Sequence, residues 1–361
     1  MTAEQIAKSM AAKFLENGNY EALGAALSDH SVAEFASAAA TTAIERTFYD
    51  EDSFSGLSVQ SVGYTPGAEE EKVVVYVTKG SQRFLNKLPK TVAEVPVVVR
   101  LMGKVKVTLQ PAMAASNSSY FFERNGRIAC GGSVAPSRED YAGTLGAFAT
   151  GPAGTFALSN NHVFAACNHT PVDMPILAPA TMDARPNRSA PREVCRFCDM
   201  FELRSGVPAL VTPISLDAAV GKVKDDSRIS SWQGDDADGY DTPKDVVAPT
   251  SGLRVKKFGR TTGLTKGTIE AFVPTPWVLP YKSRRFTSEV WFTDTWTVRG
   301  DAGEPFAMPG DSGSLVVTED GSQAVGLVFA VSNRSEYAIF CPIADVLAQF
   351  GGLSLLSGHG T

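Results

Sequence analysis

The chain lacks the features that mark a strongly charged partner, a membrane span or an export signal. Its 33 lysines and arginines are fewer than its 39 aspartates and glutamates, giving a formal net charge of -6, which argues against nucleic acid or an anionic membrane as a partner. No apolar run approaches the roughly 18 residues of a membrane-spanning helix. The N-terminus has no positively charged segment followed by an apolar core, as a signal peptide would have. We therefore expect a cytoplasmic protein with no nucleic-acid and no membrane partner.

Cysteines and phosphate-binding motifs are also scarce. The chain has five cysteines, and an odd number without an export signal indicates reduced thiols. Cys195 and Cys198 have the spacing of half a zinc knuckle, which Cys167 and His169 could complete. Two free thiols in a surface loop, or a local disulfide, are the favoured alternatives. No glycine-rich phosphate loop is present, so we expect no nucleotide site, no metal and no cofactor.

The first third of the chain mixes helical and strand patterns. Over 3–47, Ala, Leu, Glu and Lys dominate and apolar residues recur at helical spacing, which predicts helices broken at 17–19. Strand-like runs over 72–78 and 95–101 then flank a short predicted helix over 81–88. A strand, a helix and a strand within about 30 residues outline a crossover unit.

The rest of the chain is β-rich. From about residue 120, short β-branched and aromatic runs alternate with Gly, Pro, Asn and Asp turns, which is typical of an all-β sandwich or barrel. A helical segment over 342–350 closes this part. The predicted organisation is a helix-rich α/β accessory module over 1–112, a linker over 113–127, an all-β domain over 128–350 and a flexible tail over 351–361.

One turn in the β-rich part is suited to presenting a nucleophile. It reads Pro309-Gly310-Asp311-Ser312-Gly313-Ser314, and apolar strand-like runs follow it. Glycines on both sides of Ser312 let the backbone adopt angles that other residues resist, so two backbone N–H groups can converge on one oxyanion. An ordinary hairpin loop is the alternative, because Gly, Asp and Ser are common turn residues.

A serine nucleophile needs a base, usually histidine, and the chain has only four histidines. His162 directly follows a strand-like run, in Ser159-Asn160-Asn161-His162-Val163. His30 lies in the predicted helical region, His169 in a loop and His359 in the tail. We therefore predict that His162 is the base, with a structural histidine as the alternative.

The base in turn needs a carboxylate to fix its tautomer and orientation. Asp217 interrupts an otherwise apolar strand-like run, and a buried carboxylate requires a partner. An exposed aspartate at a strand start is the alternative interpretation. Asp173, Asp183 and Asp199 lie among loop-like residues, so Asp217 is the predicted orienting acid.

These three motifs, in the order His, Asp, Ser, resemble those of the chymotrypsin-like (trypsin-fold) serine peptidases. Gly310 to Ser314 is similar to the nucleophile motif, Asn161-His162-Val163 to the bacterial histidine motif and Leu216 to Val220 to the aspartate motif. Separations of 55 residues (162 to 217) and 95 residues (217 to 312) suit a triad with His and Asp in one barrel and Ser in the next. The resemblance covers about residues 128–350 and is closest to the bacterial trypsin-like branch.

The resemblance implies two six-stranded antiparallel barrels with a site between them and no cofactor. Ser312 would attack a peptide carbonyl, His162 would accept and return its proton, and Asp217 would orient His162. Backbone N–H groups of Gly310 and Ser312 would bind the oxyanion. An α/β-hydrolase is set aside, because its histidine comes last in the chain, where only His359 stands here.

We therefore predict a serine endopeptidase that acts on protein or peptide substrates, with an N-terminal module that regulates it or recruits a protein partner. The alternative is a non-catalytic protein-interaction module on a peptidase fold.

The resemblance also bears on specificity and activation. It implies that Phe306 lies at the base of the primary specificity pocket and that Phe329 to Val331 line it, which favours a small, apolar or occluded pocket. Arg127-Ile128 is similar to the activation site at which cleavage frees an amino terminus to pair with Asp311. A strand entering the first barrel is the favoured alternative for this segment.

Overall fold

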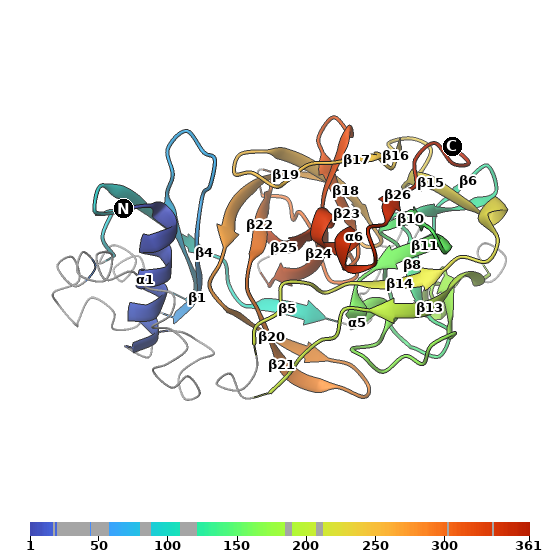
Figure 1. The fold of residues 1–361 in the computed structure, drawn as a ribbon, viewed down its shortest axis with the longest axis horizontal. Coiled ribbons are helices and arrows are strands. Elements are labelled where there is room, and N and C mark those ends of the chain that lie inside the picture. The colour runs from blue at the N-terminus through green and yellow to red at the C-terminus, as the bar shows by residue number, and fades with distance from the viewer. Residues whose placement is uncertain are drawn as a thin grey trace.

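The computed structural model describes residues 1–16, 19, 44, 58–79, 88–108, 121–184, 190–206, 212–301, 303–333 and 336–361. The chain forms a β-rich body with helix α1 at one end and the C-terminus toward the other (Figure 1). None of the helices in these ranges is long and apolar enough to cross a bilayer.

Six strands close a barrel in the C-terminal half. In order around it they are β18 (Arg254–Gly259), β19 (Gly263–Val273), β22 (Thr295–Gly300), β25 (Tyr337–Pro342), β24 (Gln323–Ser332) and β23 (Leu315–Thr318). Each strand pairs antiparallel with the next, and β23 pairs back with β18. Apolar side chains such as Ile269, Val298 and Phe340 fill this barrel, as expected when alternate residues of each strand face inward.

A second, curled sheet consists of seven strands that precede this barrel in the chain and one, β26, that follows it. Its eight strands run in the order β26 (Ser354–Leu355), β10 (Ala147–Gly151), β11 (Gly154–Ser159), β14 (Ala219–Lys222), β13 (Arg192–Met200), β12 (Pro175–Ala178), β8 (Ser133–Pro136) and β9 (Gly143–Thr144). The predicted all-β arrangement of two antiparallel barrels is confirmed. Within the described residues, however, the first barrel is a curled half-barrel and not a closed six-stranded cylinder.

Smaller elements connect these sheets. A four-stranded sheet has the order β16 (Tyr240–Asp241), β15 (Ile229–Gln233), β7 (Arg127–Cys130) and β6 (Glu123–Arg124). The Arg127 segment is therefore a strand, which was the favoured interpretation of that sequence. Other short elements in this part of the chain are α5 (Asn161–Phe164), η2 (Thr181–Asp183), η3 (Asp226–Arg228), β17 (Asp245–Val246) and α6 (Ile343–Gln349). Helix α6 confirms the closing helix predicted over 342–350.

The N-terminal region packs a helix on a small sheet. Helix α1 (Ala3–Glu16) buries Ile6, Met10 and Phe14 against apolar residues of β1 (Ser58–Tyr64) and β2 (Val73–Lys79), which confirms the first predicted helix and its apolar spacing. The predicted strands are also confirmed: β2 pairs in parallel with β4 (Val95–Leu101), beside β3 (Thr91–Val92). Apart from Asn19, Ile44 and Leu88, the further helices predicted in this region lie outside the described residues.

Strand β5 (Val105–Thr108) joins this region to the barrel. It lies between two strands that come much later in the chain, β24 and β20 (Trp277–Lys282). It is antiparallel to β24, with Val331 opposite Lys106 and Ser332 opposite Val105. It is parallel to β20, which forms a hairpin with β21 (Thr287–Phe292). The N-terminal region therefore supplies a central strand to the sheet that contains the barrel.

The C-terminal tail, for which the sequence predicts flexibility, makes defined contacts in the structure. Ser354 and Leu355 form β26 against β10. Further on, the backbone of His359 exchanges hydrogen bonds with Ser231, donating to its Oγ at 2.9 Å and accepting from its N–H at 2.9 Å. The sequence prediction missed this docking because it depends on backbone groups of a distant strand.

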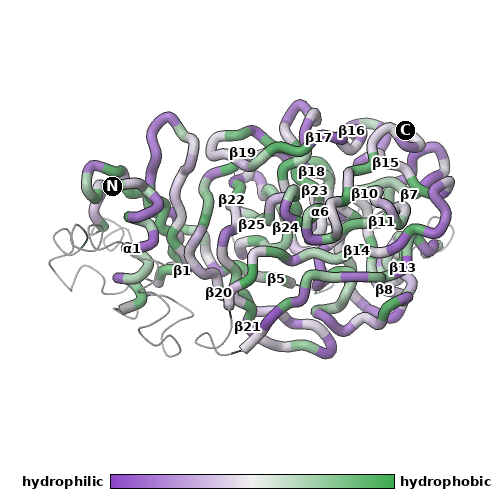
Figure 2. The backbone as a smooth tube through the Cα atoms, in the orientation of Figure 1, coloured by the Kyte–Doolittle hydropathy of each residue, from purple (hydrophilic) through white to green (hydrophobic). Residues whose placement is uncertain are grey.

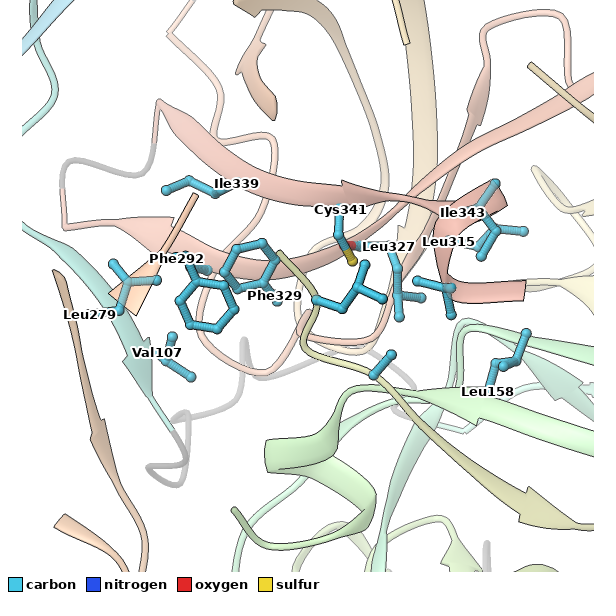
Figure 3. Packing of buried hydrophobic residues seen from close by; sticks show 14 of the residues in the cluster. Val107, Leu158, Leu279, Phe292, Leu315, Leu327, Phe329, Ile339, Cys341 and Ile343 are labelled. Carbon is cyan, nitrogen blue, oxygen red and sulfur yellow. The ribbon is translucent and has the colours of Figure 1, made fainter. Parts of the chain in front are cut away.

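Hydrophobic residues concentrate on the strands of the body, and hydrophilic residues gather in the connecting turns (Figure 2). One continuous apolar cluster spans the curled sheet, the closed barrel and the β20–β21 hairpin. Phe292 and Phe329 stack in this cluster with ring centroids 4.7 Å apart, close to Leu279 and Val107 (Figure 3). This packing fixes the hairpin and β5 against the face of β24 that points away from the interior of the closed barrel.

Candidate active site

Two neighbouring strands bring His162 and Asp217 together. Strand β11 ends at Ser159, which pairs with Ala219 at the start of β14. The chain therefore turns into α5 next to the point where β14 begins. The Asn160 side chain joins the two ends by donating a hydrogen bond to the backbone carbonyl of Asp217 at 2.6 Å. Residues 55 positions apart thus meet because their strands are adjacent in the sheet.

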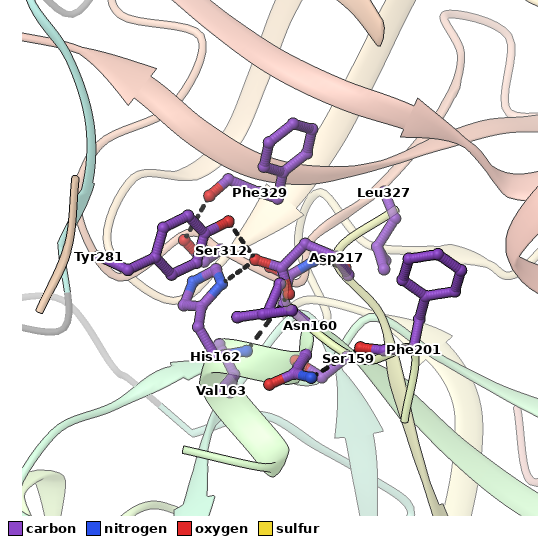
Figure 4. Close-up of polar contacts among 12 residues, drawn as sticks. Ser159, Asn160, His162, Val163, Phe201, Asp217, Tyr281, Ser312, Leu327 and Phe329 are labelled. Carbon is purple, nitrogen blue, oxygen red and sulfur yellow. Dashed lines mark hydrogen bonds and ion pairs between the residues drawn. The ribbon is translucent and has the colours of Figure 1, made fainter. Parts of the chain in front are cut away.

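His162 and Asp217 form a buried hydrogen-bonded pair. Asp217 Oδ2 lies 2.5 Å from His162 Nδ1, and Asp217 Oδ1 accepts a bond of 3.2 Å from the His162 backbone N–H (Figure 4). Both side chains are fully buried. Since a carboxylate accepts but does not donate, Nδ1 carries the proton and Nε2 is the free basic nitrogen. Nε2 has no hydrogen-bond partner among the described residues.

Ser312 lies beside this pair on the glycine-flanked turn. Gly310 and Gly313 both have positive φ, 101° and 96°, so the turn uses the conformations that glycine permits. The Ser312 hydroxyl donates a long bond of 3.5 Å to the Phe329 carbonyl, and Figure 4 shows it next to the rings of His162 and Tyr281. This hydroxyl forms no hydrogen bond with His162 Nε2, which has no partner among the described residues.

Hydrogen bonds from both sheets hold the serine turn in place. Thr144, on β9 of the curled sheet, donates its N–H to the Ser312 carbonyl at 2.8 Å and its hydroxyl to the Gly310 carbonyl at 2.9 Å. Thr261 of the closed barrel donates to the Pro309 carbonyl at 2.8 Å. The Gly310 N–H belongs to the same trans peptide as that carbonyl and so points the opposite way. Neither the Gly310 nor the Ser312 N–H donates to a described residue, which leaves both groups available for an anion.

Asp311 holds the same turn in place through a buried ion pair and several hydrogen bonds. Its carboxylate is fully buried and lies 3.4 Å from Lys257 Nζ, which is also buried. It accepts hydrogen bonds from the N–H groups of Thr261 and Met308, at 2.7 and 2.9 Å, and from the Thr262 hydroxyl at 2.7 Å. Burial lowers the pKa of Lys257, and the attraction of Asp311 opposes that shift. Asp311, the residue expected to pair with a freed amino terminus, thus has a partner within the barrel.

The sequence prediction missed Tyr281. Its hydroxyl donates to Asp217 Oδ2 at 2.7 Å, the same oxygen that faces His162 Nδ1 (Figure 4). Its ring meets the His162 ring edge-on with centroids 5.8 Å apart. Tyr281 lies on β20, outside all three sequence motifs. The apolar and aromatic residues of that segment favour a strand, but they give no sign of which carboxylate its tyrosine will meet.

Phe306 is a core residue of the closed barrel. It is fully buried, and its ring centroid lies 5.9 Å from Lys257 Nζ. Its carbonyl accepts the Thr265 hydroxyl at 2.6 Å. The strand predicted to line the pocket, Phe329 to Val331, is buried as well. Of the pockets that the sequence suggested, this packing favours the occluded one.

The cysteines form neither a disulfide nor a metal site in the part of the chain that the structure describes. All five are unpaired, and four of them are buried. Cys195 and Cys198 lie on strand β13, so the predicted surface loop is wrong. No group of three or more potential metal-ligating side chains occurs within the described ranges, which contradicts the zinc alternative.

No family model and no curated protein sequence matches the chain. Among solved structures it is similar to Protease A of Thermobifida fusca, with 17% identity and a TM-score of 0.40 over 64% of this chain and 100% of that one. It is also similar to the chymotrypsin of Cellulomonas bogoriensis, with 16% identity and a TM-score of 0.42 over 63% of this chain and 98% of that one. A Nocardiopsis protease aligns with 17% identity and a TM-score of 0.40, over 62% and 95% of the two chains. These proteins are chymotrypsin-like bacterial serine proteases, the family that the sequence motifs resemble.

Proposed function

We propose that this chain is a serine endopeptidase in which Ser312, His162 and Asp217 form the catalytic triad. The observation that carries the proposal is the buried hydrogen bond between His162 Nδ1 and Asp217 Oδ2, which leaves a basic Nε2 next to the serine turn. An imidazole held in this tautomer by a carboxylate is what activation of a serine requires.

Catalysis proceeds in two acyl transfers, the first to Ser312 and the second to water. Ser312 Oγ forms a bond to the carbonyl carbon of the peptide and gives its proton to His162 Nε2. The negative charge that develops on the carbonyl oxygen is bound by the N–H groups of Gly310 and Ser312. The C–N bond then breaks as Nε2 returns the proton to the leaving amine. Water attacks the acyl-enzyme by the same route, and the acid product leaves Ser312 free. Asp217 keeps its negative charge throughout and stabilises the imidazolium.

The N-terminal region acts, in this proposal, as a regulatory module. Strand β5 occupies the edge of β24 at Val331 and Ser332, two residues beyond Phe329, whose carbonyl accepts the Ser312 hydroxyl. A free sheet edge binds an extended peptide by adding it as a strand, so β5 competes with a substrate for this edge. His162 is fully buried and Ser312 is only 7% exposed, which fits a site that opens when the module moves. A protein partner that binds the module is the expected trigger.

A specific observation favours the second candidate, a non-catalytic interaction protein on a peptidase fold. The Ser312 hydroxyl bonds to Phe329 and leaves His162 Nε2 unpartnered. In a working triad this hydroxyl must turn to Nε2, although the bond is often formed only when substrate binds.

A fluorophosphonate probe tests between the two. An active enzyme labels at Ser312, and both Ser312→Ala and His162→Ala abolish labelling, because the first removes the nucleophile and the second its base. Ser314→Ala serves as the control, since Ser314 lies on the same turn and donates to the Asp311 carbonyl at 2.6 Å. If neither the wild type nor a variant with a loosened β5 labels, the interaction protein becomes the better account.

A further inference from the structure

The orienting carboxylate of the proposed triad has a second partner. Asp217 Oδ2 accepts hydrogen bonds from two side chains at once, 2.5 Å from His162 Nδ1 and 2.7 Å from Tyr281 Oη. Among the described residues, the other oxygen, Oδ1, accepts the longer bond of 3.2 Å from the His162 backbone alone. The oxygen that orients the imidazole is therefore held by hydrogen bonds from both His162 and Tyr281.

The Tyr281 ring is held firmly. It is 1% exposed and stacks on Phe292 with centroids 5.9 Å apart and an interplanar angle of 16°. Phe292 stacks in turn on Phe329, and the backbone of Tyr281 pairs with Val107 of β5 and Ser288 of β21. A ring packed in this way cannot swing its hydroxyl elsewhere, so the phenol is a fixed donor toward Asp217.

The charges around Asp217 make this donor important. Asp217 acts on the hydroxyl of Tyr281 and on the thiols of Cys167 and Cys341, and its charge contributes to raising the pKa of each. Burial raises the pKa of Cys341 to about 12 and raises the pKa of Cys167 and Tyr281 further above the neutral range. All three groups therefore stay protonated, and the phenol is the one that donates a strong, charge-assisted hydrogen bond.

We infer that Tyr281 is a positioning residue for the proposed triad. Its hydroxyl fixes Asp217 so that Oδ2 faces His162 Nδ1, and it takes up part of the carboxylate charge that would otherwise act on the imidazole alone. The expected effect on rate rests on the proposed function. The hydrogen bond between Tyr281 and Asp217 can be tested separately, by a measurement that needs no activity.

The test is Tyr281→Phe in the full chain, which removes one oxygen and keeps the ring. We expect the second-order rate of fluorophosphonate labelling to fall about tenfold, the effect of losing about 1.4 kcal/mol from a charge-assisted bond. Without the phenol, the full carboxylate charge acts on His162 and favours the imidazolium. The acid limb of the pH–rate profile therefore moves to higher pH.

Tyr76→Phe is the matched control. Tyr76 is also a fully buried tyrosine whose hydroxyl donates to a carboxylate, Glu270, at 3.0 Å. Its replacement removes a buried hydroxyl that bonds to Glu270 and Thr297 and not to Asp217, and we expect the acid limb to stay in place. An acid limb that is unchanged in Tyr281→Phe, or that moves equally in both variants, would overturn the inference.

A measurement that needs no activity separates this inference from the proposed function. In full-length Ser312→Ala protein, NMR follows the His162 imidazole through a pH titration with and without Tyr281→Phe. An upward move of its midpoint in the double variant supports the positioning contact, even if the wild type fails to label and the hydrolase proposal falls. No move overturns the positioning role, whatever the labelling shows.

Discussion

At the residue scale, the serine turn depends on a backbone conformation that only glycine adopts easily. Gly310 has a φ of 101°, and a Cβ added there would lie 2.3 Å from Thr261 Oγ1 and 2.7 Å from Arg260 Nη1. We expect Gly310→Ala to shift the peptide that carries the proposed oxyanion donor and to slow fluorophosphonate labelling by about 10²-fold or more. Gly321→Ala, in the hairpin turn between β23 and β24 with a φ of 81°, carries the backbone strain without the clash at the added Cβ and should label normally. Normal labelling of Gly310→Ala would contradict the assigned role.

The buried ion pair under the turn leads to a prediction about stability. Lys257→Met leaves the Asp311 carboxylate buried without its cation, and breaking a buried pair costs about 3–5 kcal/mol. Hydrogen bonds from Thr261, Thr262 and Met308 persist, so we expect the lower end of that range. Denaturant unfolding measures the loss.

Two further variants test whether the uncompensated charge of Asp311 causes that loss of stability. Adding Asp311→Asn should recover part of it, because the uncompensated charge is then gone. Lys266→Met removes a surface pair with Glu319, in which the side chains are 50% and 35% exposed, and should cost at most about 1 kcal/mol. Equal losses from Lys257→Met and Lys266→Met would show that Asp311 does not depend on its cation.

The residues of the candidate site differ in how well their sequence positions reveal them. His162, Asp217 and Ser312 stand in short segments with local signals: a strand end, an interrupted apolar run and a glycine-flanked turn. The structure brings His162 into contact with Asp217 and places Ser312 beside them. Tyr281 has no such signal, because its role arises from the packing of a hairpin that the motifs do not include. Local patterns thus predict residues that need a special backbone, and miss residues that act through tertiary contact.

At the scale of elements, β5 is the strand whose partners matter most. The sequence assigns residues 105–108 to the end of the accessory module, and nothing local predicts that they pair with Val331 and Ser332. Pairing of distant strands depends on the whole fold, so strand type is easier to predict than strand partner. The same reason explains why the docking of the C-terminal tail was missed.

A proline in β5 tests whether this strand restricts access to the site. Lys106→Pro removes a backbone donor from a strand that lies between two others, where proline is poorly tolerated. We expect β5 to separate from β24 and labelling at Ser312 to speed up at least several-fold. Lys106→Ala keeps the backbone donor and should label like the wild type. Slower labelling or none in the proline variant, with native circular dichroism, would show that β5 supports the site and does not block it.

At the scale of the whole molecule, the N-terminal module and the barrel are joined at several buried points. Thr275, which lies between β19 and β20, accepts a bond from the Val62 N–H at 2.9 Å and donates to the Val62 carbonyl at 2.7 Å. Tyr76 of β2 shares a hydrogen bond of 2.7 Å with Thr297 of β22, and Tyr64 pairs with Phe272. A module joined in this way should unfold with the barrel in one cooperative transition.

Thr275→Val tests whether the junction with the module controls the site. It leaves the Val62 N–H and C=O buried without this partner, so we expect a loss of about 1–3 kcal/mol. Because β1 then holds less firmly to the barrel, β5 should be released more often, and labelling at Ser312 should speed up as in Lys106→Pro. Denaturant unfolding and the labelling rate are measured on the same full-length protein.

Thr295→Val is the control that separates release of the module from general loosening. Thr295 accepts a buried hydrogen bond of 2.9 Å from Trp277 Nε1, a contact between β22 and β20 that involves no residue of the module. Its loss should cost a similar free energy of unfolding without freeing β1. If both variants label equally fast, access to Ser312 follows overall stability. If only Thr275→Val labels faster, the junction between the N-terminal region and the barrel sets access to Ser312, and a partner that pulls on β1 would raise the proposed activity without touching the proposed triad.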